Sequence, residues 1–179
     1  LSRNIRGLDA NRAAALRNNV PIVCMQEVDL AETNVSELRA QAKEAGYRIF
    51  FSAPTSLSID GRTAHGRRAA ILVKNTIKAI DITDEADNNT NFLKQTGRWL
   101  EIMIPTGDGS NQMCIACLYG ISGASNDNAK KEDMERILAG TLLRAVQMKS
   151  VPYVICTDLN YDPSKSNVLE KAISKELIY

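Results

Sequence analysis

Two short apolar runs in this chain each end in residues that carry acid or amide groups. Pro21-Ile22-Val23-Cys24-Met25 is followed closely by Glu27, and Val151-Pro152-Tyr153-Val154-Ile155-Cys156 is followed by Asp158 and Asn160. Apolar runs of this length are typical of strands that are buried on both faces. The rim of such a sheet is where α/β proteins assemble active sites. The pattern therefore predicts hard oxygen ligands at a sheet rim, and with them a divalent-metal site that acts on phosphate.

The candidate residues have complementary chemistry. Mg²⁺ usually takes one or two carboxylates and keeps waters that a substrate phosphate can replace. Glu27 is the natural ligand for Mg²⁺, or for Mn²⁺ in its place, and Asn4 at another strand end supplies an amide oxygen. Asp158 could orient or deprotonate a water, Asn160 could hold a phosphate oxygen, and Tyr119 offers a phenolic donor. The metal would neutralise phosphate charge and lower the pKa of bound water.

Each of these residues also has an ordinary structural interpretation. A single Glu after a strand is usually a solvated loop residue or a cap, and Asp158 could cap a turn with Asn160. Tyr119 could be a packed aromatic at a strand end, and Gln26 is better explained as a structural amide than as a ligand. The joint pattern of Asn4, Glu27, Tyr119 and Asp158 favours the functional interpretation.

The elements that must position these residues can be read from periodicity and turn chemistry. Expected helices cover 9–18, 34–45, 127–149 and 167–176, with Asp9 as the first N-cap and Asn34 with Glu37 as a capping box. Expected strands cover 2–5, 22–26, 47–52, 69–74, 77–82, 99–104, 112–119 and 151–156, and 77–82 is expected to pair with 69–74 as a hairpin. Because strands and helices do not strictly alternate, two packed sheets flanked by helices are favoured over a doubly wound sheet.

Composition is that of an ordinary soluble globular domain, with 179 residues, 44% hydrophobic and 24% charged. The formal net charge of +1 argues neither for nor against nucleic acid. Loops are expected at 56–68 and 84–91. Between 60 and 80 there are several basic residues, which form either a solvated surface or a strip that follows a phosphate backbone: Arg62, Arg67, Arg68, Lys74 and Lys78.

The four cysteines all lie in apolar runs. Cys114 and Cys117 have a CxxC spacing within an expected strand, which favours buried free thiols over a zinc site because no second pair exists. Unpaired buried thiols suit a reducing compartment, so we expect an intracellular protein, nuclear or cytoplasmic. The apolar runs are too short to span a bilayer and no signal peptide is visible, so no membrane association is expected.

Five segments of the chain share the order and spacing of a known superfamily. They are Asn4-Ile5-Arg6-Gly7-Leu8, Val23-Cys24-Met25-Gln26-Glu27, Gly97-Arg98-Trp99-Leu100, Leu118-Tyr119-Gly120 and Thr157-Asp158-Leu159-Asn160. On these segments nearly the whole chain resembles the endonuclease/exonuclease/phosphatase superfamily. That superfamily includes apurinic endonucleases, pancreatic deoxyribonuclease and retrotransposon endonucleases. Gln26-Glu27 and Asp158-Leu159-Asn160 are the most specific part of the resemblance.

The resemblance implies a four-layer α/β sandwich of two packed mixed β-sheets flanked by helices. Residues 1–179 would form one domain of this kind, incomplete at both ends and without its last C-terminal elements. The implied activity is hydrolysis of phosphodiesters or phosphomonoesters, most simply an endonuclease-like action on nucleic acid, with DNA favoured. By the same resemblance Glu27 would bind magnesium, Asn4 would lie near metal and phosphate, Tyr119 would contact the scissile phosphate, Asp158 would activate water and Asn160 would position the substrate.

The sequence departs from the family pattern at several points. Thr157 and Leu159 stand where the family usually has Gly and Phe, and Arg67-Arg68 stands where relatives often carry glycines. The family completes its site with a late Asp-His pair that has no counterpart here, and His65 in the 56–68 loop is the sole histidine. Two rival functions stay open: a phosphatase for a small or lipid-linked phosphate, and a non-catalytic relic or binding module. DNA versus RNA and the oligomeric state are also left open.

Overall fold

The computed structural model describes residues 1–179 apart from 18, 56–65, 86, 88–89, 108–110 and 179. The strands are β1 (Ser2–Asn4), β2 (Ile22–Ala31), β3 (Tyr47–Phe51), β4 (Gly66–Lys74), β5 (Ile80–Asp81), β6 (Trp99–Thr106), β7 (Asn111–Tyr119) and β8 (Tyr153–Asp158). The helices are α1 (Leu8–Leu16), α2 (Val35–Glu44), α3 (Asn91–Gln95), α4 (Asn128–Gln147) and α5 (Asn167–Ser174). Short 3₁₀ segments cover Glu32–Asn34, Thr83–Glu85 and Pro163–Lys165.

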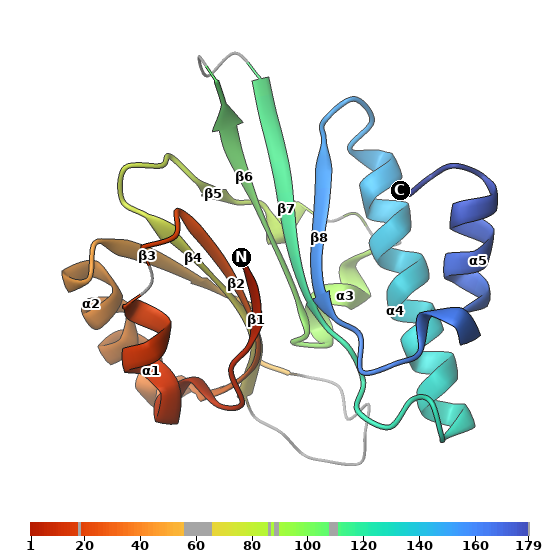
Figure 1. The fold of residues 1–179 in the computed structure, drawn as a ribbon, viewed down its shortest axis with the longest axis horizontal. Helices are drawn as coiled ribbons and strands as arrows, with labels where there is room; N and C mark the ends of the chain where they lie inside the picture. The colour runs from red at the N-terminus through yellow and green to blue at the C-terminus, as the bar shows by residue number, and fades with distance from the viewer. Residues whose placement is uncertain (18, 56–65, 86, 88–89, 108–110, 179) are drawn as a thin grey trace.

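The strands form two mixed four-stranded sheets that face each other (Figure 1). Sheet A has the order β1-β2-β4-β3, and sheet B has the order β5-β6-β7-β8. In each sheet one pair is parallel, β1 with β2 and β7 with β8, and the other pairs are antiparallel. Helices α1 and α2 cover the outer face of sheet A, and α4 and α5 lie on the outer side of sheet B. The expected α/β sandwich of two mixed sheets flanked by helices is confirmed.

Alternation along the strands divides the core into three apolar layers. On β2 and β4, Met25 and Leu72 face the helices α1 and α2, whereas Cys24 and Ile71 face sheet B. On β6, Leu100 and Ile102 face sheet A, whereas Trp99 packs with α4. Each sheet is therefore buried on both faces, which explains why its strands read as continuous apolar runs.

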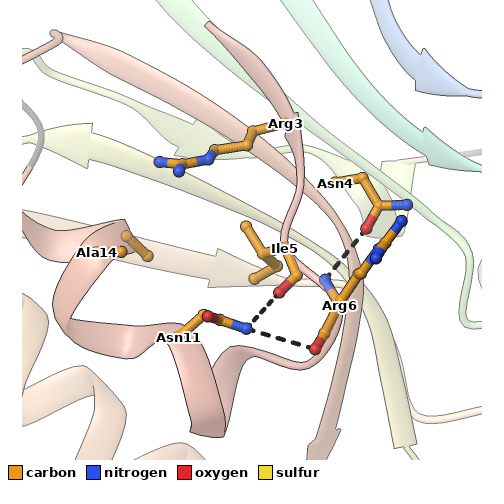
Figure 2. Close-up of a pocket in the computed structure, with 7 residues that line it drawn as sticks. Arg3, Asn4, Ile5, Arg6, Asn11 and Ala14 are labelled. Carbon is orange, nitrogen blue, oxygen red and sulfur yellow. Dashed lines mark hydrogen bonds between the residues drawn. The ribbon is translucent and has the colours of Figure 1, made fainter.

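A tight turn joins β1 to α1. Gly7 has a φ of +87°, a backbone conformation that glycine adopts without strain. The Asn11 side-chain nitrogen donates to the carbonyl oxygens of Ile5 at 2.8 Å and Arg6 at 3.5 Å, which holds the turn from within the helix (Figure 2). The predicted N-cap at Asp9 is wrong because the helix already begins at Leu8, and Gly7 occupies the cap position.

The expected hairpin between 69–74 and 77–82 is also wrong. Strand β4 already has β2 on one side and β3 on the other, so it has no free edge for a further strand. After a turn in which the Ile77 N–H donates to the Lys74 carbonyl at 2.9 Å, the chain crosses to the second sheet. There β5 pairs antiparallel with β6, with Ile80 opposite Met103.

Two predicted helix starts can be compared with the structure, and one helix was not predicted. Helix α4 starts at Asn128, one residue after the predicted start, and the Asp127 carboxylate caps it by accepting from the Lys130 N–H at 3.2 Å. Asn34 stands at the N-cap of α2, but its side chain makes no capping hydrogen bond because a 3₁₀ turn already precedes the helix. The short helix α3 was not predicted, since its five residues follow an acidic, Asn-rich segment.

No helix within the described residues has the length and apolar character needed to cross a membrane.

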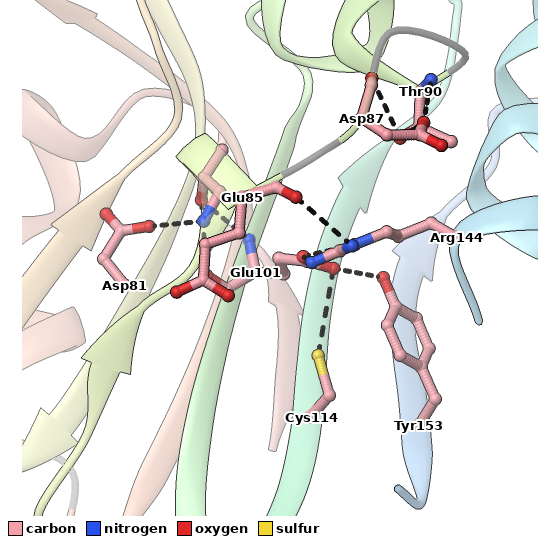
Figure 3. A network of polar contacts seen from close by, with 9 residues as sticks. Asp81, Glu85, Asp87, Thr90, Glu101, Cys114, Arg144 and Tyr153 are labelled. Carbon is pink, nitrogen blue, oxygen red and sulfur yellow. Dashed lines mark hydrogen bonds and ion pairs between the residues drawn. The ribbon is translucent and has the colours of Figure 1, made fainter. Parts of the chain in front are cut away.

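A buried ion pair anchors α4 to sheet B. Glu101 on β6 is fully buried, and its Oε1 accepts from Arg144 Nε at 2.7 Å and Nη2 at 2.6 Å. Its Oε2 accepts from the Tyr153 hydroxyl at 2.7 Å (Figure 3). Burial, and then the charge of Glu101, raise the pKa of Tyr153, so the hydroxyl keeps the proton that it donates. Three elements, β6, α4 and β8, thus meet at one carboxylate.

A second constraint lies where β7 ends. Gly120 follows Tyr119, and its N–H donates to the Asp158 carbonyl at 2.7 Å. A Cβ placed on Gly120 would lie 1.7 Å from the Leu159 carbonyl oxygen, which is backbone and cannot rotate away. Glycine is therefore required here by close approach of two chain segments, and not by an unusual φ.

Replacing Arg144 by methionine should leave Glu101 charged and buried without its partner. We expect Arg144→Met to lower the free energy of unfolding by about 3–5 kcal/mol, measured by urea denaturation. The matched control on the same helix is Arg136→Met. The exposed Arg136 guanidinium lies 4.7 Å from the Phe92 ring centre, and its loss should cost about 1 kcal/mol or less. Equal losses in the two variants would show that the buried pair does not anchor α4.

Gly120→Ala should destabilise the fold by overpacking. We expect a loss of about 1–3 kcal/mol in the free energy of unfolding, accompanied by amide NMR shifts at Leu159 and Asn160. Gly66→Ala is the control, because its Cβ would meet the nearest atom at an ordinary 3.5 Å. A Gly120→Ala protein as stable as the control would contradict the close approach.

Candidate active site

Asn4 ends β1, and Glu27 lies beside it within β2, just past the point where the β1–β2 pairing stops. The expectation that Glu27 follows the end of its strand is wrong, because β2 continues to Ala31 through a register shift. Asn4 lies opposite Gln26 in the β1–β2 register, so Glu27 is one residue past the last paired position. The Ile5 N–H donates to the Gln26 carbonyl at 3.1 Å and the Gly7 N–H to the Glu27 carbonyl at 2.8 Å, which keeps both chains together beyond the strand pair.

The backbone at Glu27 is bent. Its φ is +57°, and the β2–β4 register shifts between Gln26 and Leu30. Such irregularities re-aim a side chain at a sheet rim, and left-handed backbone at a non-glycine residue is concentrated at functional sites. The half-buried Glu27 carboxylate makes no hydrogen bond or ion pair with any described residue. Its negative charge is thus left without a protein partner in that part of the chain.

One hydrogen bond joins the rims of the two sheets. The Asn4 side-chain nitrogen donates to Asp158 Oδ2 at 2.6 Å, across 154 positions of sequence. The Asn4 Oδ1 accepts from the Arg6 N–H at 3.1 Å. The structure therefore brings together the candidates from the first and last parts of the chain.

Asn160 is held next to Asp158. Its N–H donates to Asp158 Oδ1 at 3.2 Å, and its side-chain nitrogen donates to the Gly120 carbonyl at 3.5 Å. Asn160 has a φ of +49°, a left-handed conformation that asparagine tolerates better than most residues. Thr157, expected at a turn where glycine would be freer, instead lies within β8 opposite Leu118, where a β-branched residue is well suited.

Tyr119 lies opposite Asp158 in the parallel β7–β8 register. Residues opposite each other on paired strands share a face of the sheet, so both side chains project from the same side. Tyr119 is largely buried, and its hydroxyl lies 3.3 Å from the Ser122 hydroxyl. Its ring packs under Arg98, whose guanidinium carbon is 5.1 Å from the ring centre.

Arg98, whose role the sequence left open, binds the backbone beneath the site. It is 4% exposed, and its Nη1 donates to the Gly120 carbonyl at 2.7 Å. The Arg98 carbonyl in turn accepts from the Tyr119 N–H at 2.9 Å. Arg98 therefore positions Tyr119 and Gly120 from the protein side.

Gln26 is a structural amide, as expected. Its buried side-chain nitrogen donates to the Ser2 hydroxyl at 2.9 Å and to the Cys156 carbonyl at 3.3 Å. It also lies 3.5 Å from the Cys117 sulfur. Because Cys117 and Cys156 belong to sheet B, Gln26 links the two sheets directly below the rim. None of the four cysteines forms a disulfide; Cys24, Cys114 and Cys117 are buried, and Cys156 is half-buried.

The basic residues of the 60–80 segment are mostly paired. Arg67 binds Glu32 at 2.9 Å, Arg68 binds Asp29, and Lys74 donates to the Asn19 side chain at 2.5 Å. Arg62 and His65 lie outside the described residues. The pairing favours an ordinary solvated surface over a strip available to a phosphate backbone.

Sequence reasoning gave no role to Arg3 and Arg6. Both line a pocket of about 210 Å³ next to Asn4, between β1 and α1 (Figure 2). The sequence did contain one signal for this pocket: Arg6 lies between Asn4 and Gly7, in the Asn4–Leu8 segment that carries the family resemblance.

The oxygen atoms at the rim are of the kind that a hard divalent cation prefers. No group of three or more His, Cys, Asp and Glu side chains among the described residues is arranged to hold a metal ion. A cation here would therefore use one or two carboxylates, an amide oxygen and oxygens from water or phosphate, which is the set that Mg²⁺ favours. Glu27 offers a carboxylate with no described partner, and Asn4 Oδ1 keeps one lone pair beside its bond to Arg6.

Comparison with known proteins gives a clear answer for the fold. No family model matches the sequence, and no curated protein sequence matches it. Among solved structures, the human nocturnin catalytic domain with bound sulfate superposes with a TM-score of 0.58 at 17% identity, over 93% of this chain and 59% of that domain. An AP endonuclease from Leishmania major gives 0.56 at 18% identity, over 89% of this chain and 54% of its own.

A third structure carries the family name. An endonuclease/exonuclease/phosphatase family protein from Bacteroides thetaiotaomicron gives a TM-score of 0.53 at 15% identity, over 97% of this chain and 67% of its own. This chain thus spans less than two thirds of the nocturnin domain and of the AP endonuclease. The fold that the family resemblance implied is confirmed: the chain has the fold seen in these endonuclease/exonuclease/phosphatase structures.

Proposed function

We propose that this chain is a metal-dependent phosphoesterase that hydrolyses phosphodiester bonds of nucleic acid, with DNA as the favoured substrate. The observation that carries the proposal is the 2.6 Å hydrogen bond between Asn4 and Asp158. It brings an amide and a carboxylate from opposite sheets to one rim, beside the bend in β2 that bears Glu27. The fold, shared with nucleases and phosphatases, supports a phosphoesterase at this general level.

In this proposal Glu27 and Asn4 hold Mg²⁺, which Mn²⁺ could replace. A bound divalent cation would neutralise charge on the phosphate and lower the pKa of a coordinated water. Both residues suit the role because Glu27 has no described partner and Asn4 is fixed by two hydrogen bonds. A ligand that is already oriented loses little conformational freedom when it binds.

Asp158 would act as the base that orients and deprotonates the attacking water. Its two oxygens accept one hydrogen bond each, from Asn4 and from the Asn160 N–H, so each keeps lone-pair capacity for a further donor. The side-chain amide of Asn160 would donate to a phosphate oxygen. The hydroxyl of Tyr119, with Ser122 as its partner, would donate to the scissile phosphate.

Two rival functions share the same site. A phosphatase would use these residues on a terminal phosphate, and a non-catalytic relic or binding module would keep the fold without turnover. Substrate choice separates the three possibilities, because only a nuclease nicks plasmid DNA and only a phosphatase prefers a monoester.

Isosteric removal of the two carboxylates tests the site. We expect Mg²⁺-dependent nicking of supercoiled plasmid by the wild-type chain, and a loss of about 10²-fold or more in rate in Glu27→Gln and in Asp158→Asn. Glu132→Gln, which removes an exposed carboxylate on α4, is the control and should retain the wild-type rate.

The outcomes of this assay are distinct. Nicking that requires Mg²⁺ and disappears in both variants would support the nuclease. Hydrolysis of p-nitrophenyl phosphate without nicking would support the phosphatase. Turnover of neither substrate, with a normally folded protein by circular dichroism, would overturn the catalytic proposal and leave the relic.

Tyr119→Phe tests the phenolic donor with little change in packing. We expect kcat to fall about 10-fold to 100-fold while KM changes little, because the hydroxyl would act mainly on charge that develops in the transition state. The matched control is Tyr161→Phe, whose hydroxyl donates to the Lys165 carbonyl at 2.6 Å on the other side of the Asp158–Asn160 segment. A Tyr119→Phe enzyme with unchanged kcat would reduce Tyr119 to a packing residue.

A further inference from the structure

Two arginines beside the rim have no protein partner among the described residues. Arg3 and Arg6 are exposed and line the pocket between β1 and α1, and neither side chain has a hydrogen bond or ion pair with a described residue. Arg67 and Arg68, by contrast, are paired with Glu32 and Asp29. The uncompensated positive charge therefore lies at the β1–α1 pocket and not along the paired segment of β4.

The backbone at Arg6 is fixed in an unfavourable conformation. Its φ is +44°, and its N–H is bound to Asn4 Oδ1 at 3.1 Å. The Asn11 amide spans the turn by binding the Ile5 carbonyl at 2.8 Å and the Gly7 carbonyl at 3.3 Å. A left-handed conformation at a non-glycine residue persists where the surroundings hold it, and such residues cluster at ligand-binding positions. The Arg6 side chain thus starts from a fixed point next to Asn4 (Figure 2).

The chemistry of the pocket favours an anion. None of the described residues that line it is acidic, and the small side chains of Ala14 and Ala15 form its helix side. Both arginines are exposed at this pocket with no acidic residue among its described lining, so a bound anion would meet uncompensated positive charge. The planar donor fork of arginine matches phosphate oxygens in pairs.

We propose that this pocket binds a second phosphate group of a nucleic-acid substrate, next to the phosphate that would be hydrolysed at Asn4 and Asp158. The proposal rests on the proposed function for its substrate. Asn4 belongs to both places: its side-chain nitrogen binds Asp158, and the residue also lines the pocket. A nucleic-acid strand presents phosphates at regular intervals, whereas a simple phosphomonoester has none to place in a second pocket. Arg3 and Arg6 would therefore select a polyanionic strand over a small phosphate ester.

Binding can be tested without turnover. Anisotropy of a fluorescent duplex oligonucleotide in EDTA, measured from 50 to 200 mM salt, gives the number of phosphate contacts from the slope of log K against log salt. We expect Arg3→Gln and Arg6→Gln each to reduce this slope by about 0.9, and to weaken binding about tenfold. Arg48→Gln on β3, at the opposite edge of sheet A, removes an exposed arginine and is the control that should leave the slope unchanged.

A second arm separates a phosphate pocket from a general charge effect. Inorganic phosphate titrated into the ¹⁵N-labelled protein should shift the side-chain Nε–H signals of Arg3 and Arg6, and leave that of Arg48 in place. Because Arg48 donates to the Ile77 carbonyl at 2.9 Å, its signal also reports on folding. Equal shifts at all three arginines would reduce the pocket to non-specific attraction and overturn the proposal.

A third arm uses the ratio of kcat/KM for an oligonucleotide to that for bis(p-nitrophenyl) phosphate, which has a single phosphate. The ratio should fall about tenfold in each pocket variant, and stay constant in Arg48→Gln. An equal loss on both substrates would place the arginine at the scissile phosphate and overturn the second-phosphate assignment.

The failure of this inference and the failure of the proposed function look different. One outcome is that the wild-type chain hydrolyses neither substrate while the arginine variants still show a smaller salt slope and no response to phosphate. That result would support the phosphate pocket and contradict the catalytic proposal. If the wild-type chain cleaves both substrates and Arg3→Gln and Arg6→Gln bind the oligonucleotide as tightly as wild type, the proposed function is supported. The second-phosphate pocket is then contradicted.

Discussion

The hydrogen bond between Asn4 and Asp158 depends on how two sheets pack. Each partner is at the end of a strand in a different sheet, so its 2.6 Å length requires that the sheets meet in one register. That register is fixed by the apolar layer between them, and by Gln26 of sheet A, whose side-chain nitrogen donates to the Cys156 carbonyl of sheet B. A polar group buried without its partners would be costly, so Gln26 disfavours sliding of one sheet over the other. The geometry of the rim is thus set by the core beneath it.

Three of the six described non-glycine residues with a positive φ lie at this rim. Arg6, Glu27 and Asn160 each have a positive φ although none is glycine, and they follow β1, interrupt β2 and follow β8, respectively. Such conformations persist only where hydrogen bonds on either side hold them. Here those bonds come from Asn4, the Gly7 N–H and the carboxylate of Asp158. The hydrogen bonds at the rim therefore hold these three residues in backbone conformations that would relax if those bonds were lost.

The sequence predicted much of this arrangement, for physical reasons that also explain its failures. Buried strands such as β2 and β8 and the amphipathic helix α4 carry strong local patterns, so their type and approximate place could be predicted. Their ends could not: β2 continues past Glu27 to Ala31, and β8 includes Asp158. Strand pairing is not determined locally. Residues 77–82 have the pattern of a hairpin partner for β4, but both edges of β4 are already paired, so these residues join the other sheet. Roles set by long-range contacts were equally hidden. The positioning role of Arg98 is apparent only from its contacts with Gly120 and Tyr119. That Arg3 and Arg6 could bind an anion is apparent only because Arg67 and Arg68 are paired with Glu32 and Asp29.

The order of the strands along the chain has a consequence for how the site comes into being. All strands of sheet A precede residue 75 and all strands of sheet B follow residue 79, so the polypeptide passes between the sheets once. Each sheet can therefore form from a continuous stretch of chain with its own helices, and loop-closure entropy is spent within each half before the halves dock. Asn4 and Asp158, near opposite ends of the sequence, meet only at that docking step. The contacts across the rim therefore form only where the two halves meet, and they are lost when the halves separate.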